Sequence, residues 1–450
     1  MELTHSKIDD LFSSFIGQGA VGLAVSGGGD SMALMHLFAE WRERFPLDNS
    51  RDVVFSVDHG VRDGAADEVK MVISCAETLG FTGVPLKLEG LDQGASLQER
   101  ARDARYEAIA SEMKVMGLSC LLTAHTLDDQ AETFLMRLRR GSGIDGLTSM
   151  FPQRELYGVQ IMRPLLSLNG QVLRELLKER GVSWVEDPSN ENEDFERVEV
   201  RNLLKNLDAD GRLSDMIGQT VCRLQRGRMA LEDQALAFIK THVTMHRIGV
   251  LQVKFEEYLE LPLDVQIRVL RRVLLAFGAE GRSLSSLEGG AHHLASMGEE
   301  KFVLAGVMCE RRMDGLLQFS RESGRAPFEI VEHDFGTDQR LVIWDHRIGV
   351  RVPDDFKGAL QFRGFTKSEV SQLAEKYKGL GQAYPRFAIA RSLLPSVVGV
   401  WCDGQLLAVP QLESYDESLF VELFGDLDRY LDEAPFDRAV FPFNGWMAPL

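Results

Sequence analysis

The chain has 450 residues, of which 44% are hydrophobic, and its formal net charge is −18 at pH 7. This length suits two or three domains, and the hydrophobic content is ordinary for a globular protein. No apolar run approaches the roughly 18–20 residues that span a bilayer, and the acidic balance argues against a nonspecific polyanion binder. The first residues carry no basic segment like that of a signal peptide, so we expect a cytoplasmic protein with no membrane partner.

Short apolar runs alternate with helical periodicity through the first part of the chain. The predicted strands cover residues 21–25, 53–57, 84–88 and 119–124. The predicted helices cover residues 31–41, 64–79, 97–117 and a stretch that begins near Leu127. This alternation predicts an α/β fold with a doubly wound, mainly parallel sheet. Ligands of such sheets bind beyond the carboxyl ends of the strands, where the polar motifs of this chain lie.

The pattern changes further along the chain. Residues 197–300 read as mostly helical, and strand-like stretches return from about residue 328. We therefore expect a helical domain after the α/β domain, followed by a small α+β domain at the C-terminus. The predicted domains are residues 1–210, 211–325 and 326–450.

The five cysteines lie far apart in the sequence, and none belongs to a C-x-x-C pair. This spacing predicts no zinc knuckle, no iron–sulfur site and no disulfide framework. Scattered thiols in a reducing compartment explain the cysteines without a chemical role.

A glycine-rich loop, SGGGDS at residues 26–31, directly follows the first predicted strand. No lysine follows the glycines, which excludes a Walker loop, and the third glycine of a dinucleotide fingerprint would fall on Met32. Three glycines before a helix N-terminus still form a cradle for an anion, because backbone N–H groups can approach the ligand and the helix dipole favours phosphate. A simple capped turn would need one glycine and not three.

Asp30 is the unexpected member of this loop, because a carboxylate repels phosphate. Its presence makes sense if it recruits a divalent cation, since Mg²⁺ is usually held by one or two carboxylates together with phosphate oxygens. The loop therefore predicts a site for a phosphate ester and Mg²⁺.

The loop resembles the S-G-G-x-D-S motif of the PP-loop superfamily, whose members split ATP between the α- and β-phosphates. Further stretches resemble the tRNA(Ile)-lysidine synthase family, closely over about residues 20–205 and loosely beyond. These stretches are VDHGVR (57–62), LQERARDARY (97–106), TAHTLDDQAETFLMRLRRGSG (123–143) and WVEDPSNEN (184–192).

The resemblance implies a tRNA-modifying ligase. Such an enzyme uses ATP and Mg²⁺ to adenylate the C2 oxygen of the wobble cytidine in an isoleucine tRNA with a CAU anticodon. The amine of free L-lysine then displaces AMP and gives lysidine. The resemblance also implies tRNA-binding roles for the helical and the C-terminal domains. The sequence leaves open whether the chain works as a monomer or as a homodimer.

Other functions remain open at this point. One alternative is another PP-loop tRNA-modifying enzyme such as a tRNA thiolase, although the lack of a C-x-x-C pair counts against it. A small-molecule ligase leaves the arginine-rich stretch and the additional domains unexplained. A nonenzymatic RNA-binding or nucleotide-sensing protein is the third alternative, and the intact Asp30 and acidic helix argue against it.

The resemblance implies that ATP and its metal ion meet the loop and two histidines at strand ends. His59 would bound the adenine end and His125 would approach the phosphates, while Asp30 would hold Mg²⁺. The predicted ATP-binding residues are Ser26, Gly27, Gly28, Gly29, Asp30, Ser31, His59 and His125.

Three acids open the helix that is predicted near Leu127. Asp128 and Asp129 stand in its first turn, where helix capping alone would explain them. Glu132 lies four residues after Asp128 and three after Asp129, so one helical face gathers like charges, which is unfavourable without a cationic or donor partner. We expect Asp129 to engage the cytosine and act in catalysis together with Asp30, and Glu132 to help hold lysine. Asp128 is expected to contact substrate.

Arginines supply the basic residues that a tRNA ligand needs. Arg137 and Arg140 belong to a cluster before GSG, and Arg105 lies on the helix predicted over 97–117. We expect these three to contact substrate, because an acidic protein can still bind RNA through cations gathered on one face.

Arg197 and Arg201 stand four residues apart on a presumed helix. The resemblance implies an active-site role here, catalytic for Arg197 and substrate-binding for Arg201. Val198 departs from the family pattern, which has asparagine at this position.

Overall fold

The computed structural model divides the described residues into two compact units, one up to Arg228 and one from Met229. The long helix α9 (Arg212–His242) contributes residues to both. The described residues are 3–17, 19–46, 51–58, 64–88, 97–186, 196–207, 212–246, 250–277, 284–296, 298, 301–322, 330–334, 341–344, 348–351, 358–366, 368–372, 397–402, 404–409 and 420–423.

The first unit is built on a six-stranded sheet with the order β3-β2-β1-β4-β6-β5. Neighbouring strands are parallel except for β5, which pairs antiparallel with β6 at one edge. The predicted mainly parallel α/β sheet is therefore confirmed. The strands are β1 (Gly22–Ala24), β2 (Val53–Asp58), β3 (Thr82–Lys87), β4 (Cys120–Leu122), β5 (Gln153–Leu156) and β6 (Val159–Met162).

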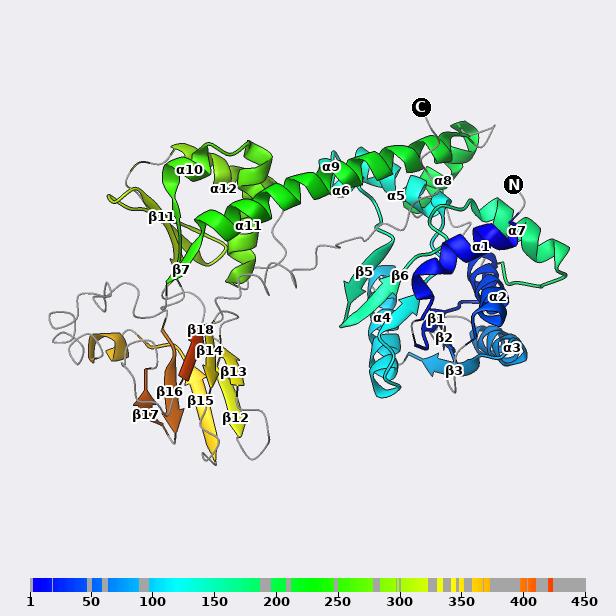
Figure 1. The fold of residues 1–450 in the computed structure, drawn as a ribbon, viewed down its shortest axis with the longest axis horizontal. Helices are drawn as coiled ribbons and strands as arrows, with labels where there is room; N and C mark the ends of the chain where they lie inside the picture. Colours follow the sequence, from blue (N-terminus) through cyan, green and yellow to red (C-terminus); the bar gives the residue numbers. More distant parts are fainter. Residues whose placement is uncertain are drawn as a thin grey trace. The chain divides into compact units, whose positions relative to one another are not determined.

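Helices cover both faces of this sheet (Figure 1). Successive strand residues point to opposite faces, so Val54 and Leu122 pack under one helical layer, whereas Phe55 and Leu121 pack against Met113 of α4 on the other face. The first layer comprises α1 (His5–Phe12), the short 3₁₀ helix η1 (Ser13–Phe15), α2 (Gly29–Arg44), α3 (Ala65–Thr78) and α7 (Gly170–Glu179), and the other face carries α4 (Leu97–Val115).

The strand order reverses between β1 and β4, which lie side by side in the sheet. Chains leaving these two strands diverge to form a crevice at the carboxyl edge of the sheet, where ligands of open α/β folds bind. The glycine-rich loop leaves β1, and α5 (Leu127–Arg139) follows β4. The topology thus brings two of the predicted site motifs to one edge.

A small apolar cluster holds α8 (Glu196–Leu207) and the start of α9 against α5. It includes Ala131 of α5, Val200 of α8 and Val221 of α9, all fully buried. The short helix α6 (Ile144–Leu147) follows α5. This packing sets the face of α8 that carries Arg197 and Arg201 beside the acids of α5.

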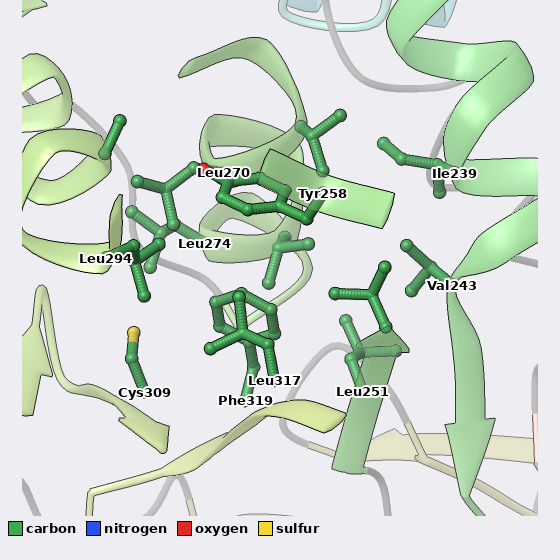
Figure 2. Close-up of a cluster of buried hydrophobic side chains, with 14 of the residues drawn as sticks. Ile239, Val243, Leu251, Tyr258, Leu270, Leu274, Leu294, Cys309, Leu317 and Phe319 are labelled. Atoms are coloured by element: carbon green, nitrogen blue, oxygen red, sulfur yellow. The ribbon is translucent and has the colours of Figure 1, made fainter. Parts of the chain in front are cut away.

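The second unit contains an antiparallel sheet with the order β7-β8-β11-β10-β9 and a core shared with its helices (Figure 2). Figure 2 shows Tyr258, Leu270 and Phe319 among the side chains that form this core. Its elements are β7 (Thr244–His246), β8 (Val250–Lys254), α10 (Phe255–Leu259), α11 (Leu263–Ala276), α12 (Leu284–Ser296), β9 (Lys301–Leu304), β10 (Val307–Arg311) and β11 (Leu316–Arg321).

The range 211–325, expected as a helical domain, contains all five strands of this sheet. Two of them, β7 and β8, lie in the stretch 197–300 that the sequence predicted to be mostly helical. Both are short, and β8 is held by pairing with β11, where Gln252 lies opposite Gln318. Pairing with a strand so distant along the chain leaves no trace in the local periodicity.

Strands dominate the described part of the C-terminal region, as the sequence predicted. They form one sheet with the order β12-β15-β16-β17 and another with the order β13-β14-β18. The division into three domains stays a prediction. Among the described helices, each is too short or too polar to cross a bilayer. The strands are β12 (Val331–Asp334), β13 (Leu341–Trp344), β14 (Ile348–Arg351), β15 (Ala359–Arg363), β16 (Gly399–Cys402), β17 (Gln405–Ala408) and β18 (Phe420–Leu423).

Candidate active site

The glycine-rich loop turns from β1 directly into α2. Gly27 has φ +87°, a conformation that favours glycine, and extended Gly28 is the N-cap of α2. The Ser31 hydroxyl donates to the Gly28 carbonyl at 2.9 Å and accepts the Ser26 N–H at 3.2 Å. The N-cap supplies no side-chain hydrogen bond, so the first N–H groups of α2 stay available to an anion.

The segment that contains Trp184 and Val185 lies over this loop. The Val185 N–H donates to the Gly27 carbonyl at 2.9 Å. A Cβ on Gly29 would lie 3.5 Å from Trp184 and 3.4 Å from the Arg174 side chain. Glycine therefore gives the loop room beneath these two side chains, to which the sequence had assigned no role.

Asp30, in the first turn of α2, carries a buried carboxylate oxygen. Its Oδ1 makes no hydrogen bond to the described residues and lies 3.8 Å from Nη1 of Arg174. Burial, and then the negative charge of Asp129, raise the pKa of Asp30 to about 6. A Cβ on Gly170 would lie 3.1 Å from this oxygen and 3.0 Å from Oδ2 of Asp128, so the two carboxylates converge.

Asp128 and Asp129 begin α5, as predicted, but face different partners. Asp128 accepts hydrogen bonds from the Asn169 side chain and the Gly170 N–H, both at 3.0 Å, and burial raises its pKa. Asp129 accepts the Thr126 N–H at 2.8 Å through one oxygen and pairs with Arg197 through the other. Asp129 therefore caps α5 with one carboxylate oxygen and takes part in the site with the other.

Glu132 is buried, with its residue only 3% exposed, and bonds two arginines of α8. Arg197 Nε donates to Oε2 at 2.6 Å, and Arg201 Nε donates to Oε1 at 2.7 Å. Burial opposes the charged form of Arg197, but Asp129 and Glu132 outweigh this effect and raise its pKa. The predicted helix and its four-residue spacing thus place both arginines on one face, against the acids.

His125 and His59 are the two histidines that were predicted to bind ATP. His125 lies in the turn after β4, where its Nδ1 is 3.0 Å from the Thr123 hydroxyl. Burial, and then the charge of Arg163, hold the pKa of His125 well below its usual range, so the ring is neutral at pH 7. His59 lies outside the described residues.

Arg105 lies on α4, as predicted, with its guanidinium carbon 5.6 Å from the ring centroid of Tyr106. Burial lowers the pKa of Arg105. Its positive charge contributes to the lowered pKa of His125, after burial and the charges of Arg163, Arg102 and Arg197.

The basic cluster at the end of α5 is largely bonded to its own unit. Arg137 donates to the carbonyls of Gly146 and Ser149 at 2.7 and 3.1 Å. Arg140 pairs with Glu196 of α8, although 64% of its side chain stays exposed. Arg137 therefore fixes the following turn, whereas Arg140 presents its charge to solvent.

The structure gathers the glycine loop, the three acids of α5 and the two arginines of α8 at one edge of the sheet. It places Arg137 and Arg140 at the opposite end of α5. Among the described residues, no group of three His, Cys, Asp or Glu side chains forms a complete metal site.

Comparisons with known proteins agree with this geometry. Residues 1–207 match the family model described as a PP-loop domain. A tRNA(Ile)-lysidine synthase from Bradyrhizobium sp. is 34% identical over 339 residues, which cover 70% of this chain and 94% of that protein. Another from Ruegeria pomeroyi is 30% identical over 413 residues, covering 90% of this chain and 93% of that protein.

A solved structure of the U34-tRNA thiolase NcsA from Methanococcus maripaludis also aligns with this chain. It covers 49% of this chain and 78% of its own, with a TM-score of 0.41 and 17% identity. A score this low carries no weight for function.

The raised pKa of Asp30 predicts a pH-dependent cost of folding. Above pH 6 the buried carboxylate is ionised and destabilises the folded state, and this cost disappears as pH falls from about 6 towards the unfolded value near 3.8. Without ATP or divalent ions, we expect Asp30→Asn to melt at a higher temperature than the unsubstituted protein at pH 7. The difference should shrink between pH 6 and pH 4. A difference in melting temperature that stays constant over this range would contradict the assignment.

Proposed function

Because the chain belongs to the tRNA(Ile)-lysidine synthase family, we propose that this sheet edge ligates lysine to the wobble cytidine of an isoleucine tRNA with a CAU anticodon. The observation that carries the proposal is the unbonded oxygen of Asp30, held at the phosphate-binding end of α2 and beside the acids of α5. The enzyme acts in the cytoplasm, as a monomer or a homodimer. Family membership favours this function over tRNA thiolation.

The glycine loop binds the phosphates of ATP in this proposal. Gly27, Gly28 and Gly29 bring backbone N–H groups to the N-terminus of α2, and the Ser26 hydroxyl can add a donor there, whereas the Ser31 hydroxyl already donates to the Gly28 carbonyl. These dipoles are fixed before the reaction and stabilise charge that develops on the leaving pyrophosphate. His125, and His59 by resemblance alone, would bound the nucleotide.

Asp30 is the proposed ligand of Mg²⁺. Its buried Oδ1 has no hydrogen-bond donor among the described residues, which fits a carboxylate that awaits a cation. When bound, Mg²⁺ would neutralise phosphate charge and favour departure of pyrophosphate. The positions of Asp30 and Asp128 around Gly170 keep acidic oxygens close to the phosphate-binding end of α2.

Adenylation solves a chemical difficulty of the cytosine ring. Its C2 oxygen is a poor leaving group, but attack of that oxygen on the α-phosphate releases pyrophosphate and converts the oxygen into part of AMP. The lysine side-chain amine then forms a bond to C2, the C2–O bond breaks, and AMP leaves with that oxygen and the bonding electron pair. The attacking amine must be neutral, so a carboxylate accepts a proton, for which Asp129 and Asp30 are the candidates.

Lysine is a zwitterion, and the paired charges of α5 and α8 suit it. The side chains of Arg197 and Arg201 remain 39% and 30% exposed, and their outer N–H groups can receive the α-carboxylate of lysine. Both oxygens of Glu132 bond these arginines, so we propose that Glu132 holds lysine by fixing them. Asp129, which Arg197 also bonds, is proposed to engage the cytosine, and Asp128 borders the same space.

The tRNA-binding surface is proposed to extend from the site along α5. Arg140 offers an exposed charge to phosphates, while Arg137 shapes the adjoining turn and Arg105 lies on α4. Residues 211–325 and 326–450 are proposed to bind the body of the tRNA, beyond the anticodon.

A direct assay tests the function. The protein is mixed with ATP, Mg²⁺, radiolabelled lysine and a CAU-anticodon isoleucine tRNA transcript, and label is counted in acid-insoluble RNA. We expect one lysine at the wobble cytidine, and loss of incorporation in Asp30→Ala. Pyrophosphate release on another RNA without lysine incorporation would keep the PP-loop chemistry and overturn the substrate.

The same assay tests the role of Glu132. Glu132→Gln weakens the hold on Arg197 and Arg201, so we expect the KM for lysine to rise about 10-fold or more while the KM for ATP stays within about twofold. Glu199→Gln is the matched control, because Glu199 lies on α8 and pairs only with Arg139 at the surface among the described contacts. An unchanged lysine KM in Glu132→Gln would rule out this role.

Removal of the chain from residue 323 onward tests the C-terminal domain. This cut leaves the core around Tyr258 and Phe319 complete. We expect the KM for tRNA to rise about 10-fold or more, since phosphate contacts dominate nucleic-acid affinity, with little change in the KM for ATP. Equal KM values for tRNA before and after truncation would argue against a tRNA-binding role.

A further inference from the structure

Arg174, on α7, lies across the glycine loop, although no sequence motif had marked it as a site residue. Its Cγ is 3.4 Å from the position of a Cβ on Gly29, at the first turn of α2. Its Nη1 is 3.8 Å from Oδ1 of Asp30. The stem of the side chain thus packs over the phosphate-binding helix terminus, and its charged end reaches the proposed metal ligand.

The contact between Arg174 and Asp30 is too long for a hydrogen bond. Asp30 Oδ1 keeps no donor among the described residues, whereas Arg197 and Arg201 bond Glu132 at 2.6 and 2.7 Å in the same site. The Arg174 side chain is also 45% exposed, and its guanidinium makes no hydrogen bond to the described residues. An arginine placed only to neutralise Asp30 would bond it as the other two bond Glu132.

Gly170 provides the space that this guanidinium occupies. A Cβ there would lie 3.1 Å from Nη1 of Arg174 and equally close to Oδ1 of Asp30. These distances are tighter than ordinary van der Waals contact, so any larger residue would push the guanidinium away from the loop. The lack of a side chain at Gly170 therefore lets the Arg174 guanidinium lie beside α2 without a hydrogen bond to a carboxylate of the described residues.

With ATP bound, the negative charges at the loop would call for a cationic side chain such as Arg174. The triphosphate of ATP is strongly anionic, the loop offers backbone dipoles and hydroxyls, and Asp30 and Asp128 add negative charge nearby. Guanidinium groups bind phosphate oxygens through two parallel N–H bonds, which suits a polyphosphate better than a lone carboxylate.

We propose that Arg174 is a phosphate-binding residue for ATP and for the pyrophosphate that leaves it. With no nucleotide bound, the guanidinium lies loosely beside Asp30. When ATP binds, it turns onto the phosphate oxygens and leaves the Asp30 carboxylate to its cation. This inference rests on the proposed function, because it assigns a ligand to the same glycine loop.

Binding of inorganic pyrophosphate tests the inference without tRNA or lysine. Titration calorimetry with Mg²⁺ present would compare the full-length protein with Arg174→Ala, Arg174→Lys and Lys178→Ala. Lys178 is the matched control, since it is an exposed cation one turn further along α7. We expect the Kd for pyrophosphate to rise about 10-fold or more in Arg174→Ala, less in Arg174→Lys, and not in Lys178→Ala.

Several outcomes would overturn the inference. An unchanged or lower Kd in Arg174→Ala, at an unchanged melting temperature, would show that Arg174 only balances the charge of Asp30. If Arg174→Ala does not fold, Arg174→Lys decides in its place, because loss of the forked geometry should still weaken binding. Absence of pyrophosphate binding by the unsubstituted protein would also overturn it.

Kinetics separate this inference from the proposed function. In the lysine incorporation assay, Arg174→Ala should raise the KM for ATP and leave the KM for lysine unchanged. A protein that binds pyrophosphate through Arg174 but incorporates no lysine would refute the proposed substrate and retain the phosphate site. If the protein makes lysidine and Arg174→Ala leaves the KM for ATP unchanged, the proposed function is retained and the phosphate-binding role of Arg174 is refuted.

Discussion

Repulsion among closely placed carboxylates is the constraint around which the active-site edge is organised. Asp30, Asp128, Asp129 and Glu132 converge where β1 and β4 end, and burial raises the pKa of Asp30 and of Asp128. The fold meets this cost in two ways. It brings cationic side chains from other helices to some of the acids, and it keeps the pKa of Asp30 near 6 where no such bond is made.

The acids fall into two groups that differ in whether an arginine bonds them. Asp129 and Glu132 are bonded by Arg197 and Arg201, which makes them parts of a rigid, nearly neutral wall. Asp30 keeps an unbonded oxygen, and is therefore the carboxylate best prepared to accept a cation. The edge of the sheet thus offers two different balances of charge, one at Asp30 and one at the acids bonded by arginine.

Helix packing is what delivers the partners to these acids. The buried cluster of Ala131, Val200 and Val221 packs α8 against α5. This apolar contact sets the distance between the acids of α5 and the arginines of α8. The bonds from Asn169 and Gly170 to Asp128 likewise tie the start of α7 to the start of α5 and bring Arg174 over the glycine loop. Core residues remote from the reaction therefore determine the electrostatics of the site.

The family resemblance implied the role of the arginine pair on α8. Local spacing in the sequence was enough to predict the parallel sheet, the loop at residues 26–31 and the acids in the first turn of α5. Each of these depends on residues within about one or two helical turns, where periodicity and turn chemistry act directly. The short strands β7 and β8 escaped prediction because a distant strand, β11, pairs with β8 and stabilises them.

Only the tertiary structure decided which charges meet. Glu132 and Arg197 are 65 positions apart along the chain, and an acidic helical face alone is equally compatible with a metal ion, a lysine or an arginine as its partner. No motif in the sequence had singled out Arg174. Its place over Gly29 follows from how α7 packs on α2, because long-range packing, and not local sequence, determines which side chains share the edge of the sheet.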